Sequence, residues 1–205
     1  MSGLTELLVA TNNAGKVREL GRALSGVPLR LRLLDEFAGV PEAEEPGETF
    51  AENATLKALH YSSRTGLLTL SDDSGLVVDA LGGRPGVHSA RYAGRDATYA
   101  ERIARLLEEV EASGGDLRSA RFVCVVAVVE PASREVFTFE GRCEGRIAHA
   151  PRGSGGFGYD PVFIPEGHER TFGELPEEVK DRISHRALAV ADAARFLRER
   201  FGGSP

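Results

Sequence analysis

A short, largely apolar run from Leu67 to Leu70 is followed almost at once by two adjacent carboxylates, Asp72 and Asp73. The run predicts a short buried strand, and the serine and glycine after the acids predict a turn at its end. Because neighbouring side chains of an extended chain point to opposite faces, we expect Asp73 to face a cleft and Asp72 to hold the turn. An isolated Asp-Asp pair more often only caps a turn, but the glycine-rich segment 82–86 favours a functional loop here.

Strand-like and helix-like patterns alternate along the rest of the chain. Strands are predicted at 7–10, 29–34, 67–70, 120–130 and 135–144, and helices at 16–24, 50–64, 99–112 and 185–201. Two helix starts carry a capping box, Thr49 with Glu52 and Thr98 with Glu101. The segment 131–134 joins two strands as an antiparallel hairpin. This order predicts an α/β fold with a mixed β-sheet and flanking helices, forming one domain over residues 1–205 with two lobes.

The composition excludes several classes of protein. Charged residues make up 27% of the chain and the net charge is −6, which argues against a surface that binds a nucleic acid polymer. No apolar run approaches the roughly 18 to 20 residues of a membrane span, and no presequence is evident, so we expect no membrane contact. The two cysteines, Cys124 and Cys143, have no metal-ligand spacing, so we expect buried thiols in a reducing, cytoplasmic compartment.

Two glycine-containing segments resemble nucleotide-binding motifs by letters alone. Residues 153–158 match the dinucleotide fingerprint, but the following chain reads as extended and bounded by prolines, whereas the fingerprint needs a helix there. Residues 14–17 resemble a P-loop, but Ala10 replaces its first glycine and Val17 replaces the hydroxyl residue that would bind magnesium. We therefore expect neither a Rossmann site nor a Walker-type NTPase, and we expect the glycines at 153–158 to shape a loop against a flat ligand.

The loop from Thr11 to Lys16 is a candidate phosphate site. It follows a predicted strand and opens a helix, so it offers hydroxyl, amide and backbone N–H donors together with an ammonium group. The chain has only three lysines against 22 arginines, which suggests that Lys16 is kept for its compact charge. The alternative is an ordinary polar turn with a capping asparagine.

Two further segments carry chemistry with an ordinary alternative beside it. Glu44 and Glu45 offer carboxylates to a hard cation, although an acidic loop is usually only solvated. Residues 184–186, Ser-His-Arg, place a hydroxyl, an imidazole and a guanidinium together, although alone they read as a helix cap with surface cations.

Taken together, these segments resemble the inosine triphosphate pyrophosphatase family, also called Ham1-like, over nearly the whole chain. The matching segments are 11–16, 44–45, 49–54, 57–58, 72–76, 80–83, 85–86, 89–92, 156–161 and 184–186. Ala187 and Gly173 depart from the residues that are commoner at their places, and neither change removes a chemical group. The resemblance implies two lobes around a nucleotide-binding cleft, a homodimer, and hydrolysis of unusual purine nucleoside triphosphates (ITP, dITP and XTP) to the monophosphate and pyrophosphate.

The resemblance also implies roles for particular residues. Asp73 is the proton acceptor, and Mg²⁺ is held by Glu44 and Asp73, with Glu45 as the alternative to Glu44. The substrate is bound by Thr11, Asn12, Asn13, Ala14, Gly15, Lys16, Ser74, Phe157, Gly158, Tyr159, Asp160, Lys180, His185 and Arg186. In this scheme the rings of Phe157 and Tyr159 stack on the purine. Lys180, His185 and Arg186 donate to its O6, an acceptor that adenine lacks.

Several alternatives stay open at this stage. The pattern does not show how GTP is excluded, how ITP, dITP and XTP rank, whether Mn²⁺ replaces Mg²⁺, or whether Asp73 both binds metal and accepts a proton. Other hypotheses are a nucleotide-binding module without catalysis and a related pyrophosphatase that acts on other modified nucleotides.

Overall fold

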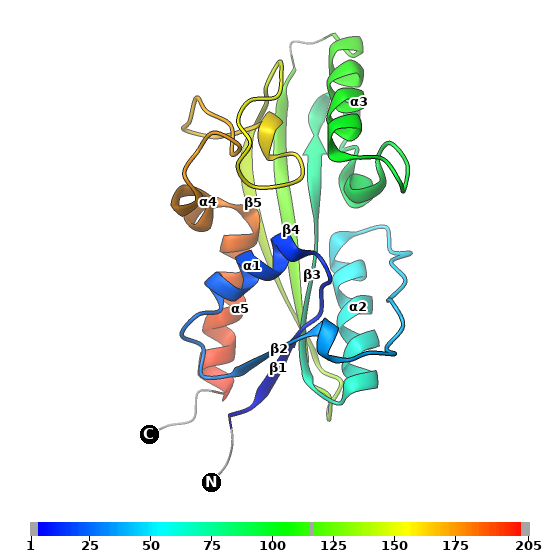
Figure 1. The fold of residues 1–205 in the computed structure, drawn as a ribbon, viewed down its shortest axis with the longest axis vertical. Helices are drawn as coiled ribbons and strands as arrows, with labels where there is room; N and C mark the ends of the chain where they lie inside the picture. Colours follow the sequence, from blue (N-terminus) through cyan, green and yellow to red (C-terminus); the bar gives the residue numbers. More distant parts are fainter. Residues whose placement is uncertain (1–3, 115–116, 202–205) are drawn as a thin grey trace. The chain divides into compact units, whose positions relative to one another are not determined.

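Helices and strands are interleaved along the chain in the computed structural model, which describes residues 4–114 and 117–201 (Figure 1). The strands are β1 (Glu6–Val9), β2 (Arg30–Leu33), β3 (Leu68–Val78), β4 (Ser119–Val129), β5 (Val136–Ile147) and β6 (Phe163–Pro165), and the helices are α1 (Ala14–Ala23), α2 (Phe50–Thr65), α3 (Tyr99–Ala112), α4 (Glu177–Ile183) and α5 (His185–Phe201). The strands form one six-stranded sheet in the order β2-β1-β3-β4-β5-β6. Because β1 is parallel to β2 and β3 while β6 is antiparallel to β5, the predicted mixed sheet is confirmed.

Local signals place the ends of the long helices. The Thr49 hydroxyl accepts from the Glu52 N–H, and the Glu52 carboxylate accepts from the Thr49 N–H, so the predicted capping box starts α2. Gly66 ends this helix with a φ of 69°, a left-handed conformation that glycine adopts without strain. Thr98 and Glu101 repeat the box at α3. Both α3 and α5 have the predicted bounds.

The hairpin between β4 and β5 is also confirmed. The Glu130 N–H donates to the Glu135 carbonyl at 3.1 Å, and the Arg134 N–H donates to the Glu130 carbonyl at 2.9 Å. The predicted turn after Asp73 is wrong, because β3 continues through both aspartates to Val78. An acid stays in a buried strand when nearby cations neutralise it, and both aspartates have such partners. Helix α4 was not predicted, because it has only seven residues and no side-chain cap.

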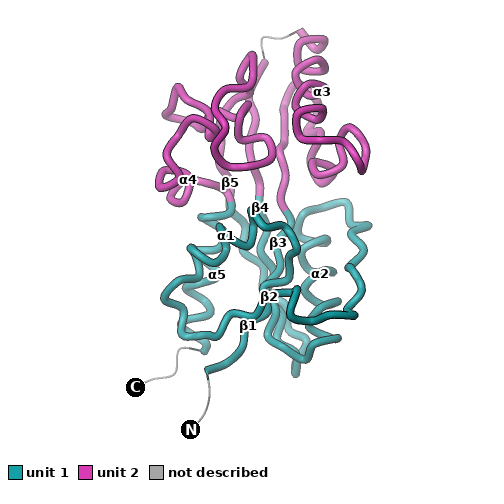
Figure 2. The backbone as a smooth tube through the Cα atoms, viewed as in Figure 1, with its two compact units in different colours: residues 1–73, 124–141, 186–205 teal, residues 74–123, 142–185 magenta. Residues whose placement is uncertain are grey.

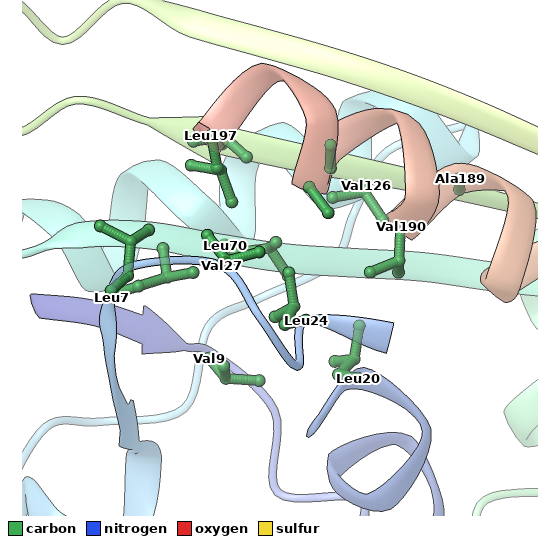
Figure 3. Close-up of a cluster of buried hydrophobic side chains, with 14 of the residues drawn as sticks. Leu7, Val9, Leu20, Leu24, Val27, Leu70, Val126, Ala189, Val190 and Leu197 are labelled. Carbon is green, nitrogen blue, oxygen red and sulfur yellow. The ribbon is translucent and has the colours of Figure 1, made fainter. Parts of the chain in front are cut away.

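The chain divides into two compact units (Figure 2). Unit 1 lies within residues 1–73, 124–141 and 186–205, and its main core joins the sheet to α1 and α5. Figure 3 shows Leu7, Val9 and Leu70 of the strands against Leu20 and Leu24 near α1 and Ala189, Val190 and Leu197 of α5. A second cluster packs Ala54 and Ala58 of α2 against Val125, Ala127 and Val129 of β4. Buried apolar faces thus hold α1, α2 and α5 to the part of the sheet that carries the aspartates.

Unit 2 comprises residues 74–123 and 142–185 and has its own core. Phe122, Phe163 and Phe172 pack there with Leu106 of α3. The predicted buried thiols are confirmed, with Cys124 in unit 1 and Cys143 in unit 2. In the described part of the chain, no helix has the length and apolar character to cross a membrane. One domain over residues 1–205 and a cleft between two lobes remain predictions.

Candidate active site

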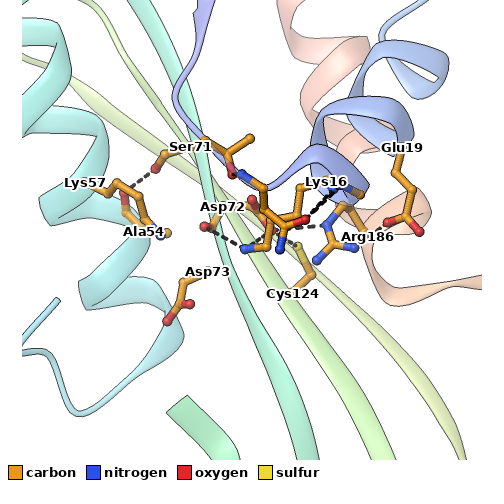
Figure 4. Close-up of polar contacts among 12 residues, drawn as sticks. Lys16, Glu19, Ala54, Lys57, Ser71, Asp72, Asp73, Cys124 and Arg186 are labelled. Carbon is orange, nitrogen blue, oxygen red and sulfur yellow. Dashed lines mark hydrogen bonds and ion pairs between the residues drawn. The ribbon is translucent and has the colours of Figure 1, made fainter. Parts of the chain in front are cut away.

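Asp72 is the centre of a buried charge cluster in unit 1 (Figure 4). Its Oδ2 atom lies 3.0 Å from Lys16 Nζ and 3.2 Å from Arg186 Nε, and the Cys124 thiol approaches the same oxygen at 3.8 Å. Burial would raise the pKa of Asp72, but Lys16 and Arg186 hold it well below its usual range. Asp72 is therefore a permanent anion inside β3, and it binds cations where we had predicted that it would hold a turn.

Arg186 lies in the first turn of α5 and is 3% exposed. Its Nε donates to Asp72, and its Nη1 donates to the Glu19 carboxylate of α1. Burial lowers the pKa of Arg186, but the charge of Asp72 raises it and that of Glu19 adds to the increase. The net effect is a raised pKa. The guanidinium thus stays charged and ties the start of α5 to α1 and β3.

Asp73, the predicted proton acceptor, is 7% exposed and has different partners. Asn53 Nδ2 donates to its Oδ2 at 3.2 Å. Burial raises the pKa of Asp73 above the usual aspartate value, the charges of Lys57 and Lys16 lower it, and that of Glu45 raises it again. The two adjacent aspartates therefore have opposite shifts of pKa, and only Asp73 is biased toward accepting a proton.

The same arrangement distinguishes the two candidate glutamates. Lys57 Nζ lies 2.7 Å from Glu45 Oε1. Burial lowers the pKa of Lys57, but the charges of Glu45, Asp72 and Asp73 raise it by more, so the pKa is raised. Glu44 is exposed to solvent. Glu45 is thus the glutamate whose charge acts on Asp73.

Asn53 and Lys57 are site residues whose roles the sequence reasoning missed. They are four residues apart on α2, so they share one face of the helix, and this spacing is the signal that was available. Asn53 also accepts from the Gly47 N–H at 2.7 Å and donates to the Gly47 carbonyl at 3.3 Å. A Cβ atom at Gly47 would lie 2.7 Å from Asn53 Oδ1. The absence of a side chain at Gly47 therefore lets Asn53 fasten the acidic loop beside Asp73.

The donor set fits a hard divalent cation. Among the described residues, no group of three or more histidines, cysteines, aspartates or glutamates forms a ready metal cage. Mg²⁺ does not need one, since it commonly binds one or two carboxylates together with waters and substrate phosphates. Asp73 and Glu45 supply two carboxylates, the charge of Glu45 raises the pKa of Asp73, and a bound cation would offset that repulsion.

The predicted phosphate loop is an exposed cap on α1. Asn13 Oδ1 accepts from the N–H groups of Gly15 and Lys16 at 2.9 and 3.2 Å, and Thr11 Oγ1 accepts from the Asn13 N–H at 3.2 Å. Asn12, Asn13 and Ala14 are exposed, whereas Gly15 is buried. The capping asparagine is present, and the loop still presents exposed polar groups next to the Lys16 ammonium.

The predicted base-binding residues other than Arg186 belong to unit 2. Asp160 is 2% exposed, and its Oδ2 accepts from the Phe157 N–H at 2.8 Å and from Lys180 Nζ at 2.5 Å. The Lys180 ammonium lies 4.6 Å from the centre of the Phe157 ring. The buried Asp160 carboxylate therefore holds both the loop backbone at Phe157 and the Lys180 ammonium. A Cβ atom at Gly156 would lie 2.0 Å from this carboxylate.

The two remaining members of this group are buried. Tyr159 is 3% exposed, and its hydroxyl donates to the Ser89 carbonyl at 2.9 Å. His185 is 5% exposed and stacks on Phe122 with ring centres 4.6 Å apart. Phe157 is only partly buried, so of these three rings it is the one that can stack on a ligand. Ser74 is partly exposed in β3.

The mixed sheet and the charge cluster define an α/β protein with two buried aspartates. These aspartates contact a lysine, an arginine and an asparagine amide of neighbouring helices. Residues 7–196 match the model of the Ham1 family. The chain belongs to the Ham1 family.

Individual relatives agree with this assignment. The chain is 48% identical over 200 residues to a dITP/XTP pyrophosphatase of Geobacillus kaustophilus (strain HTA426), with 98% of each chain covered. It is 48% identical over 188 residues to a dITP/XTP pyrophosphatase of Geobacter sulfurreducens (strain ATCC 51573 / DSM 12127 / PCA), covering 92% of this chain and 94% of the relative. The solved structure of a HAM1 protein from Coxiella burnetii superposes with a TM-score of 0.89 at 44% identity, covering 96% of this chain and 100% of that one.

Proposed function

We propose that this chain is a dITP/XTP pyrophosphatase, which hydrolyses dITP, ITP and XTP to the monophosphate and pyrophosphate. The full-length relatives with 48% identity carry that name. The observation in the site that best supports the chemistry is the opposite shift of the pKa values of Asp72 and Asp73. One carboxylate is fixed as an anion that holds cations, and its neighbour is tuned to accept a proton.

Asp73 serves as the proton acceptor. Its raised pKa makes it a stronger base than a solvated aspartate, and Asn53 fixes one of its oxygens. A water molecule beside the other oxygen would lose its proton to Asp73 as it attacks the α phosphorus. Lys57 balances the charge of Asp73 and Glu45 from α2.

Asp73 and Glu45 would hold Mg²⁺, in place of the pair Asp73 and Glu44. When bound, this cation neutralises phosphate oxygens and lowers the pKa of a coordinated water. Lys16, Thr11 and Asn12 supply donors to the phosphates from the start of α1. Asn13 mainly shapes this loop, because its side-chain oxygen caps the helix.

Phe157, Lys180 and His185 form the base site in this proposal. Phe157 stacks on the purine, Tyr159 supports the loop from the core, and the ion pair with Asp160 holds the Lys180 ammonium in place as a donor to O6. A donor toward O6 favours hypoxanthine and xanthine over adenine, which carries an amine there. A contact of Arg186 with the base remains a prediction, and its ion pairs with Asp72 and Glu19 support a role in holding the charge cluster.

The test is a pyrophosphate-release assay with Mg²⁺ and a panel of dITP, ITP, XTP, GTP, ATP and dTTP. We expect fast release from the first three and little from the others, with the Asp73→Asn variant inactive on all. Binding without pyrophosphate release would support a nucleotide-binding module, and a preference for another modified nucleotide would contradict the assigned substrate class. The homodimer and the cytoplasmic location also remain predictions, and sedimentation equilibrium tests the first.

A further inference from the structure

Glu19 is the charged residue of the cluster that the proposed reaction does not use. It lies on α1, three residues after Lys16, and its carboxylate accepts from Arg186 Nη1 of α5. Its side chain is 11% exposed, and that of Arg186 is 4% exposed. Neighbouring apolar residues of the same two helices, Leu20 and Ala189, share one core cluster. The ion pair between Glu19 and Arg186 is thus buried where α1 and α5 pack on the sheet.

The charges of this cluster are balanced. Lys16 and Arg186 carry two positive charges, and Asp72 and Glu19 carry two negative ones. Both cations approach the same oxygen of Asp72, at 3.0 and 3.2 Å, so the two cations share that oxygen. Glu19 accepts from a different nitrogen of Arg186, Nη1. The guanidinium therefore has a second anionic partner besides Asp72.

We infer that Glu19 is a positioning residue for phosphate binding. By holding Arg186 from the far side, it leaves Asp72 able to fix the Lys16 ammonium at the start of α1. Without the Glu19 carboxylate, a buried guanidinium would retain Asp72 as its anion in the cluster and would draw it away from Lys16. The ammonium that we assign to the substrate phosphates would then lose its fixed position. This inference rests on the proposed function only for the identity of the polyphosphate.

The direction of the effect separates positioning from simple electrostatics. Glu19→Gln removes a negative charge, so the long-range field alone would make a polyanion bind more tightly. Positioning through Arg186 and Asp72 predicts the reverse, because the lysine donor is no longer held in place. We therefore expect Glu19→Gln to weaken the binding of inorganic tripolyphosphate by at least about tenfold.

The experiment measures tripolyphosphate affinity by calorimetry, with thermal unfolding recorded for every variant. Glu109→Gln is the matched control, because Glu109 also pairs with arginines but belongs to unit 2. We expect this control to leave the affinity unchanged. Lys16→Met should weaken binding as Glu19→Gln does, and the double variant should be no weaker than Lys16→Met alone, since both changes remove one function. Glu19→Asp keeps the charge and withdraws the carboxylate by one methylene, so it should fold and show an intermediate loss.

Three outcomes would overturn the inference. They are unchanged or tighter tripolyphosphate binding by Glu19→Gln, an additive loss in the double variant, and a loss of thermal stability alone in both Glu19 variants. The wild-type protein could bind tripolyphosphate with an affinity that depends on Glu19 and yet release no pyrophosphate from dITP. That result would refute the proposed function and leave the positioning role intact.

Discussion

Replacing each of the two adjacent aspartates by asparagine should have different consequences for stability. Asp72→Asn removes the anion that Lys16 and Arg186 share at 3.0 and 3.2 Å in a site where the aspartate is 1% exposed. Breaking a buried ion pair from one side costs about 3–5 kcal/mol, because the partner charges stay buried. Since a chain of this size loses about 2–4 °C of melting temperature per kcal/mol, we expect Tm to fall by about 6 to 20 °C.

Asp73→Asn should leave stability nearly unchanged. The native pKa of Asp73 is raised, so at neutral pH its charged form lowers the stability of the fold, and a neutral amide of the same shape removes that cost. The amide oxygen can still accept from Asn53. Activity should nevertheless fall by at least about 100-fold, because the proton acceptor is gone.

Thermal unfolding followed by circular dichroism measures the effect on Tm, and pyrophosphate release from dITP measures the effect on activity, both on the same preparations. Equal destabilisation by the two substitutions would refute the assignment of opposite electrostatic environments. A stable and fully active Asp73→Asn protein would refute its role as the base. Wild-type stability of Asp72→Asn would show that Lys16 and Arg186 do not depend on this carboxylate.

Four further outcomes follow from the site and from unit 2. Excess chelator should abolish pyrophosphate release, and full activity in EDTA would exclude the metal-assisted reaction. Gly47→Ala places a Cβ atom 2.7 Å from Asn53 Oδ1, so kcat/KM should fall by at least about tenfold with unchanged circular dichroism, whereas wild-type kinetics would show that the loop tolerates the shift. His185→Ala should lower the ratio of kcat/KM for ITP over ATP, since a lost donor to O6 costs about 1–3 kcal/mol, and equal slowing of both substrates would contradict base reading. The pKa of Glu109 is lowered to about 2 by hydrogen bonds from Arg105 and Tyr92, so its contribution to stability is present above pH 4.5 and is lost as the pH falls through about 2. In acid titrations of unfolding, the Glu109→Gln variant should therefore lose less stability than wild type. Parallel curves for the two proteins would argue against a stabilising role of the Glu109 charge.

Local patterns were sufficient for most of the fold. The capping boxes at Thr49 and Thr98 act within four residues, and the apolar periodicities act within one element, so α2, α3 and the hairpin were predictable from the chain alone. Short elements with weak local signals, such as α4, were not. The family resemblance rested on residues spread along the chain, which the match over residues 7–196 confirms.

The electrostatic roles within the site needed the tertiary structure. Asp72 and Asp73 are neighbours of the same type, and the chain gives no local reason why one should remain an anion and the other should favour a proton. That difference comes from Lys16 and Arg186, 56 and 114 positions from Asp72, which lower its pKa, and from the burial of Asp73, which raises its pKa. The ion pair of Glu45 with Lys57 of α2, on which our proposal of Glu45 over Glu44 rests, likewise forms only in the folded chain. Charges act through space over a few ångströms, so only the packing of distant segments sets the pKa values that distinguish these residues.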